Sequence, residues 1–121
     1  MSFVSSWPTT TRLRMASKAE REWMDAISRI GCVVCAMMGH WHTPGVPHHL
    51  LTDGGRRRGH LYTILLCDPG HHQNAPKGSG KISRHPNKFR FEAAYGTEES
   101  LLQRQREMVE HEANATVSRI G

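Results

Sequence analysis

The chain has few apolar residues and few cysteines, which excludes several common architectures. Hydrophobic residues make up 37% of its 121 residues, and no run of about 18 apolar residues offers a membrane span. Three cysteines are an odd number and no signal-peptide pattern precedes them, so a secreted disulfide framework is not expected. We expect a cytoplasmic protein with one small domain, whose limited core a bound metal would reinforce.

Acidic residues are scarce over the first three quarters of the chain. Residues 1–90 hold 13 Lys and Arg against five Asp and Glu, a net charge of +8, whereas residues 91–121 hold three against six, a net charge of −3. This distribution is typical of a protein whose basic part binds a polyanion. The candidate phosphate contacts are Arg56, Arg57, Arg58, Lys77, Lys81, Arg84 and Lys88.

Helical signals lie near the two ends of the chain. Residues 1–16 are rich in Ser, Thr and Pro without periodicity, and we expect a flexible basic arm there. Ser17–Glu20 has the pattern of a capping box, which predicts a helix over 18–30. Two further helices are predicted, one over 88–95 and one capped by Thr97. The apolar stripe of the last helix packs on the core or forms the seam of a weak dimer, so the chain is a monomer or a weak dimer.

Two short apolar stretches in the middle of the chain predict a β-hairpin. Residues 46–52 and 61–67 are rich in Val, Leu, Ile and Thr, and residues 53–59 between them are mostly Gly and Arg. Residues 71–83 predict a short helical turn followed by a loop. The combination of helices and a hairpin predicts an α+β fold in a single domain over 17–121.

The cysteines have the spacing of a structural zinc site. Cys32 and Cys35 are separated by two residues, which lets both thiolates reach one tetrahedral ion. Cys67 and His71, at the end of the predicted second strand, complete a Cys3His set. Such a zinc would connect the first helix to the hairpin. The alternative is three buried, reduced thiols; a redox pair is less expected, since no thioredoxin-like strand precedes the motif.

Histidines are concentrated in the same part of the chain. Eight of the nine lie between residues 32 and 85, including the adjacent pairs His48-His49 and His71-His72. Neighbouring side chains on a strand point to opposite faces. One member of each pair can therefore meet the other across the hairpin and the turn that follows it. The alternative is that these histidines lie on the surface of a zinc-ribbon-like binding module.

The order of these motifs resembles the HNH (ββα-metal) nucleases, and most closely the phage recombination-enhancement, RecA-dependent nuclease family. The resemblance spans residues 30–102, most of the chain. The motifs that carry it are His48-His49-Leu50, Gly55-Arg56-Arg57-Arg58-Gly59-His60, Leu65-Leu66-Cys67, His71-His72, Ser83-Arg84-His85 and Phe91-Glu92-Ala93-Ala94-Tyr95-Gly96-Thr97-Glu98. It implies a small ββα-metal core with a structural zinc knuckle and flanking helices.

The resemblance also implies roles for the histidines. His49 would be the general base, and His60 takes the place where many HNH enzymes have an asparagine that orients the base, so its catalytic role is open. The expected ligands of a catalytic metal are His48, His72 and His85. Three residues separate Cys67 from His71, one more than the two that commonly separate such ligands. The assignment of His71 to the structural zinc and of His72 to the catalytic metal could therefore be reversed.

The function implied is a metal-dependent DNA endonuclease of low sequence specificity that acts in phage DNA recombination. Its cofactors would be a structural zinc and a catalytic divalent metal, Mg²⁺ or Mn²⁺, with Zn²⁺ as the alternative occupant of the catalytic site in a crystal. The expected partners are DNA, including single strands or recombination intermediates, and a recombinase filament, in the cytoplasm of a bacterial host. The alternatives are a catalytically silent zinc module that binds DNA or a recombinase, and a sequence-specific homing or restriction nuclease.

Overall fold

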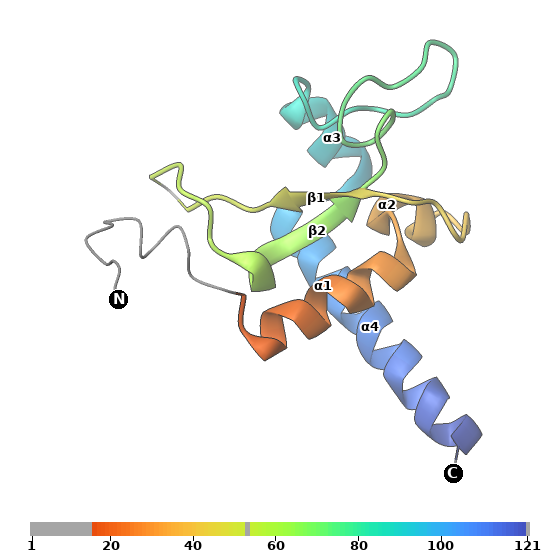
Figure 1. Ribbon diagram of the computed structural model, residues 1–121. Coiled ribbons are helices and arrows are strands. Elements are labelled where there is room, and N and C mark those ends of the chain that lie inside the picture. Colours follow the sequence, from red (N-terminus) through yellow and green to blue (C-terminus); the bar gives the residue numbers. More distant parts are fainter. Residues whose placement is uncertain (1–15, 53, 121) are drawn as a thin grey trace, which may run out of the picture.

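A computed structural model describes residues 16–52 and 54–120 of the chain, with side chains up to residue 115. The predicted basic arm lies outside the described residues, except for Ala16. Helices surround one two-stranded sheet (Figure 1), an architecture compatible with the predicted α+β class. The elements in chain order are α1 (Lys18–Ile30), α2 (Val33–Met37), β1 (Val46–His49), the 3-10 helix η2 (His60–Tyr62), β2 (Thr63–Leu66), α3 (Lys88–Tyr95) and α4 (Glu98–Ile120).

Helix α1 has the bounds that the capping box predicts. The amide of Glu20 donates to Ser17 Oγ at 3.1 Å, and the Glu20 carboxylate accepts from the Ser17 amide at 2.9 Å. The helix ends at Gly31, whose φ of 82° favours glycine. A Cβ there would lie 2.4 Å from the carbonyl oxygen of Thr43. Gly31 therefore permits the close approach in which the amide of Cys32 donates to that same oxygen at 2.7 Å.

The predicted hairpin is confirmed, with strands shorter than the apolar stretches. Strands β1 and β2 pair antiparallel, with His48 opposite Ile64 and His49 opposite Thr63. All four residues of β2 are buried, since α1, α2 and α4 pack against this strand. Gln105 of α4 satisfies the outer edge of β2: its Oε1 accepts from the Leu65 amide at 3.0 Å, and its Nε2 donates to the Thr63 carbonyl at 2.9 Å.

The core lies between the sheet and the helices. Val33 and Val34 of α2, Ile64 of β2, and Leu101 and Leu102 of α4 are almost completely buried in one cluster. The apolar stripe of α4 therefore packs on the core over its first turns, as one of the two predicted alternatives has it. The later turns of α4 extend beyond the other elements (Figure 1).

Besides the shorter strands, with η2 at the start of the predicted second strand, the structure differs from the predictions before and after the hairpin. Helix α2 was not predicted, because five residues after a Cys-x-x-Cys start are too short to show helical periodicity. Between β2 and α3 the chain forms turns and loop, with no helix over 67–87. A ββα-metal core, in which a helix follows the hairpin, is therefore not confirmed. Helix α3 buries Phe91 completely but leaves Phe89 88% exposed.

Candidate metal centres and active site

Three cysteines and one histidine gather in the core. Cys32 caps α2, Cys35 lies in its first turn, Cys67 follows β2 directly, and His71 lies in the next turn. All four are buried, and their ligand atoms lie within 4.8 Å of one another. His71 Nδ1 is 3.3 to 3.5 Å from each sulfur, and the Sγ atoms of Cys35 and Cys67 are 3.8 Å apart.

These distances fit a tetrahedral zinc ion. Zinc bonds of about 2.3 Å to sulfur and about 2.0 Å to nitrogen at tetrahedral angles require S–S distances of about 3.8 Å and S–N distances of about 3.5 Å. The Cys35–Cys67 distance and the three S–N distances agree with these values to within about 0.2 Å, and no disulfide joins the cysteines. The donor set, three thiols and an imidazole, is one that zinc prefers. The group could therefore hold a zinc ion.

Burial shifts the pKa of two members of this group, Cys32 and His71. It raises the pKa of Cys32 to about 12. It also lowers the pKa of His71 to about 4, with a further contribution from the charge of Lys81. Lys81 Nζ lies 3.5 Å from Cys67 Sγ, beside the thiols. His71 is therefore neutral at pH 7, as a metal ligand must be, and a divalent cation would supply the charge that buried thiolates need.

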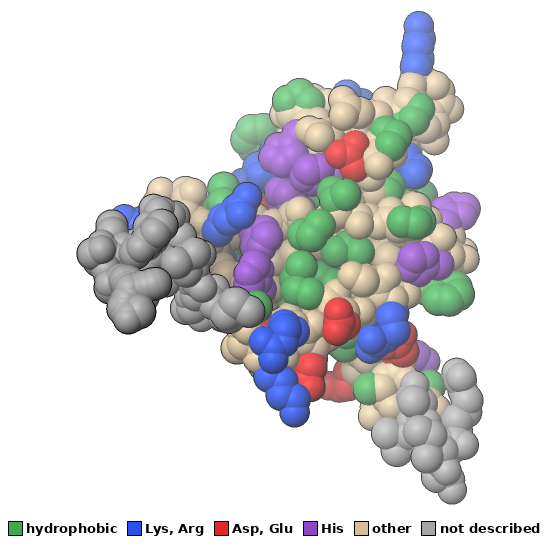
Figure 2. Space-filling model, in the orientation of Figure 1, with side chains coloured by type: hydrophobic (Ala, Val, Ile, Leu, Met, Phe, Trp, Pro, Cys, Tyr) green, Lys and Arg blue, Asp and Glu red, His purple; other side chains and the backbone are tan. Residues whose placement is uncertain are grey.

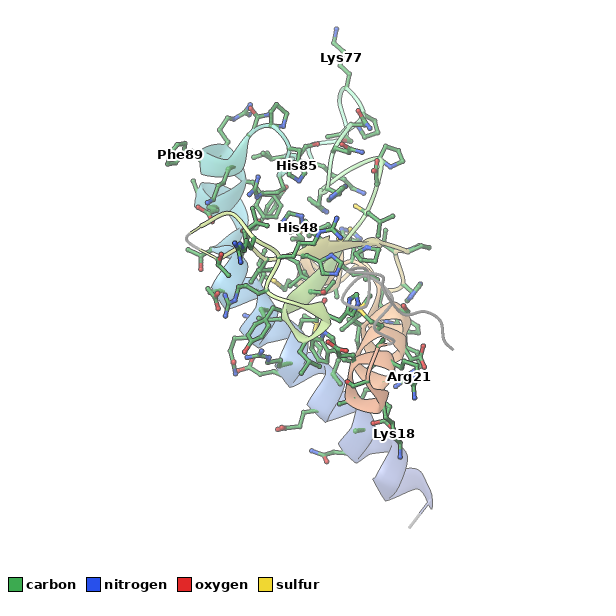
Figure 3. The ribbon with its side chains drawn as sticks, turned by 60° about the vertical axis from the view of Figure 1, so that its left-hand side comes forward. Lys18, Arg21, His48, Lys77, His85 and Phe89 are labelled. Atoms are coloured by element: carbon green, nitrogen blue, oxygen red, sulfur yellow. The ribbon has the colours of Figure 1, made fainter. Side chains whose placement is uncertain are left out.

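A second group consists of His48, His72 and His85. His48 comes from β1, His72 from the turn after β2, and His85 from the segment before α3. Each offers a nitrogen within 4.8 Å of the others, and the ring centroids are 5.1 to 5.5 Å apart. The amide of His85 donates to the His72 carbonyl at 3.0 Å. Figure 3 shows His48 and His85 near each other at the centre of the molecule.

One turn after β2 contributes to both groups. Cys67 and His71 face the sulfur cluster, while Asp68 and His72, each one residue later, face the histidine cluster. His72 Nδ1 lies 3.4 Å from Asp68 Oδ2, and the amide of His72 donates to the Cys67 carbonyl at 2.9 Å. The sequence left open which of His71 and His72 belongs to which group. In the structure, His71 lies with the cysteines and His72 lies with the other histidines.

A third histidine contact lies at the end of β1. His49 Nε2 is 3.2 Å from His60 Nδ1, the first residue of η2. One ring must donate and the other accept, so the contact couples their tautomers. Burial lowers the pKa of His49, and the charges of Arg57, His60 and His48 lower it further. His49 is therefore neutral at pH 7 and able to accept a proton.

His49 and the three histidines of the second group line one cavity. A pocket of about 310 Å³ is lined by Pro47, His48, His49, Leu51, Arg57, His72, Arg84 and His85. Figure 2 shows histidine side chains at the surface of the face it presents, with Lys and Arg side chains beside them. The pocket therefore combines a proton acceptor, a group of metal-binding type and two guanidinium groups.

Sequence reasoning missed Glu98 as part of this site. It is the first residue of α4, and its Oε2 lies 2.6 Å from His48 Nε2 and accepts from Arg84 Nε at 2.5 Å. Burial would raise the pKa of Glu98, but the hydrogen bonds from His48 and Arg84 outweigh it and lower the pKa to about 2. The carboxylate is thus ionised at neutral pH. The sequence signal that could have identified Glu98 is its place at the end of the Tyr-Gly-Thr-Glu motif, one of the motifs that carry the family resemblance.

The candidate phosphate contacts divide into two classes. The first class is exposed: Arg56 and Arg57 in the hairpin loop, Lys77 in the loop after β2 and Lys88 at the start of α3. Lys77 lies at the tip of its loop, away from His48 (Figure 3). The others have partners within the protein. Arg58 pairs with Glu99 and lies 4.2 Å over the ring of Tyr62, Arg84 pairs with Glu98, and Lys81 lies beside Cys67.

Over the part of the chain that the structure describes, no helix is both long enough and apolar enough to cross a membrane. No curated protein and no solved structure matches the chain. The model of one protein family, described as recombination enhancement, RecA-dependent nuclease, matches residues 16–110, which include both ligand groups and the His49–His60 pair. With most of its length matched, the chain belongs to this family of nucleases.

Proposed function

We propose that the protein is a metal-dependent endonuclease of the HNH type that hydrolyses DNA phosphodiester bonds with low sequence specificity in recombination. The observation that carries this proposal is the pocket that His49 lines together with the three-histidine group, while His60 contacts His49. Hydrolysis needs a base for water and positive charge at the phosphate, and both belong to this pocket. Residues 17–121 would form the one nuclease domain.

The proposed mechanism assigns a proton transfer to His49. As a neutral imidazole it accepts a proton from the attacking water, and His60 holds its ring and tautomer through the 3.2 Å contact. Arg57, in the same pocket, neutralises the phosphate. His48, His72 and His85 would hold Mn²⁺ or Mg²⁺, and the bound metal would polarise the phosphate and stabilise the leaving oxygen. The Cys3His group would hold a structural zinc.

Nicking of a supercoiled plasmid tests this function. The protein is assayed with Mn²⁺, Mg²⁺ or EDTA, in the presence and absence of RecA filaments, because the family description includes RecA dependence. We expect cleavage that EDTA stops and that His72→Ala reduces at least tenfold. His40→Ala is the matched control, since His40 is an exposed histidine outside the pocket. Cleavage that persists in EDTA or in His72→Ala would refute the metal assignment, and DNA binding without cleavage would favour a silent binding module.

Replacing Arg56, Arg57 and Arg58 together with Ala should weaken binding to all DNA sequences about equally. Each lost phosphate contact reduces the slope of log affinity against log salt by about 0.9. Arg58→Ala alone should change the slope less than the Arg56→Ala/Arg57→Ala double variant, because Arg58 already pairs with Glu99. Affinity is measured against salt for two unrelated duplexes and one single strand. A loss confined to one sequence would indicate base reading and a homing or restriction enzyme.

A further inference from the structure

Glu98 lies between two residues that line the pocket, His48 and Arg84. Its side chain is 14% exposed, and a single oxygen, Oε2, contacts both His48 Nε2 and Arg84 Nε. His48 and Arg84 are themselves only 9% and 13% exposed. A carboxylate buried to this degree is costly unless it is paired, and here the guanidinium of Arg84 supplies the compensating charge. The contact to His48 thus fixes the direction of the imidazole, and Arg84 holds the carboxylate in place.

The geometry places this carboxylate behind the proposed ligands. In the three-histidine group, the ligand atoms of His48, His72 and His85 lie within 4.8 Å of one another. Among the described residues, Glu98 is not a member of this group. The Nε2 atom of His48 is already engaged by Glu98, so Nδ1 is the ring nitrogen left for a metal. Histidine ligands commonly donate their other N–H to a carboxylate, which fixes the tautomer and makes the imidazole a better ligand.

We propose that Glu98 is a positioning residue, which accepts a hydrogen bond from His48 Nε2 and thereby directs Nδ1 of His48 to the catalytic metal. The inference rests on the proposed function, because it presumes that the three histidines bind a metal. Asp68 has a similar relation to His72, but at 3.4 Å, and it is held by the neutral amide of Gln73 at 3.0 Å where Glu98 is held by the charged Arg84. Glu98 is therefore the stronger determinant of ligand geometry.

A purely structural explanation for Glu98 makes a different prediction. An acidic residue in the first turn of α4 stabilises the helix dipole whatever it contacts. Glu99 has the same place in the helix, but its side chain is 62% exposed and pairs with Arg58 instead of His48. Glu98→Gln and Glu99→Gln thus change the charge of the helix terminus equally, and only the first changes the acceptor of His48.

The experiment is calorimetric titration of the zinc-loaded, full-length protein with Mn²⁺, alongside thermal melting. Loss of a carboxylate behind a ligand typically weakens metal binding about 10- to 100-fold. We expect a weakening of this size for Glu98→Gln and less than about twofold for Glu99→Gln. The cleavage assay should show the same split, with a higher half-saturating Mn²⁺ concentration for Glu98→Gln. Arg84→Gln, which removes the anchor but keeps the carboxylate, should weaken Mn²⁺ binding to a smaller degree and serves as the test should Glu98→Gln fail to fold.

Two outcomes would overturn the inference, and they can be told apart. In the first, the wild type binds Mn²⁺ and Glu98→Gln binds it with the same affinity; Arg84→Gln takes the place of Glu98→Gln if that variant does not fold. This result would refute the role of Glu98 and leave the proposed function standing. In the second, the wild type binds no Mn²⁺, or His72→Ala binds it as tightly as the wild type does. This result would refute the three-histidine metal site itself, and the role of Glu98 with it.

Discussion

His49→Ala is expected to reduce DNA cleavage about 10²- to 10⁴-fold, the range for loss of a general base. Zinc content, melting temperature and DNA affinity should stay close to those of the wild type. A base acts on the water only in the transition state, so its removal should lower the rate constant and not ground-state binding. The half-buried His49 ring lies at the end of β1 outside the hydrophobic core, and its removal leaves the core intact.

The partner of His49 provides the matched controls. His60→Asn introduces the residue type that the resemblance to HNH nucleases implies at this place. Asparagine can still hydrogen-bond to His49, so the loss of activity should be smaller than that of His60→Ala. The rate of plasmid nicking is measured at saturating metal for all three variants. If His49→Ala cleaved at the wild-type rate, the base would have to be sought elsewhere in the pocket.

Much of the fold could be predicted because its signals are local. The capping box of Ser17 and Glu20 and the apolar spacing after it determine the bounds of α1 within one stretch of chain. The Gly- and Arg-rich turn between two apolar stretches indicates the β1–β2 hairpin in the same way. Cysteine spacing is also a local signal, and the predicted set of three cysteines and His71 does converge in the core.

The features that could not be predicted join residues far apart in the sequence. Glu98 contacts His48 from 50 positions away, and Gln105 reaches the backbone of β2 from 40 or more. A glutamate at the start of a helix and a glutamine in its middle both resemble ordinary surface residues in sequence. Their burial follows from the packing of α4 on β2. Apolar periodicity predicts that this helix packs on the core, but it does not give the orientation of the helix against the strand. The pairing of Arg58 with Glu99 escaped prediction for the same reason.

The last prediction concerns the structural zinc. Cys67→Ser is expected to release the zinc and to unfold the domain or lower its melting temperature strongly. A structural zinc contributes on the order of 10 kcal/mol, and a small domain has a total stability of about 5–15 kcal/mol. Loss of one thiolate from four ligands therefore removes a large part of the free energy of unfolding. Cys32→Ser should behave alike, since its thiol belongs to the same group.

Cys67→Ser should also disrupt the histidine pocket, which separates it from a variant of the pocket alone. The turn that brings Cys67 and His71 to the Cys3His group also brings His72 to His48, and the amide of His72 donates to the carbonyl of Cys67. His72→Ala should keep its zinc and melt like the wild type while losing cleavage. Zinc content by atomic emission and melting by circular dichroism distinguish the two variants. A soluble Cys67→Ser protein with an unchanged, cooperative melting transition would show that the Cys3His group holds no structural zinc, and that the turn after β2 is stabilised by packing alone.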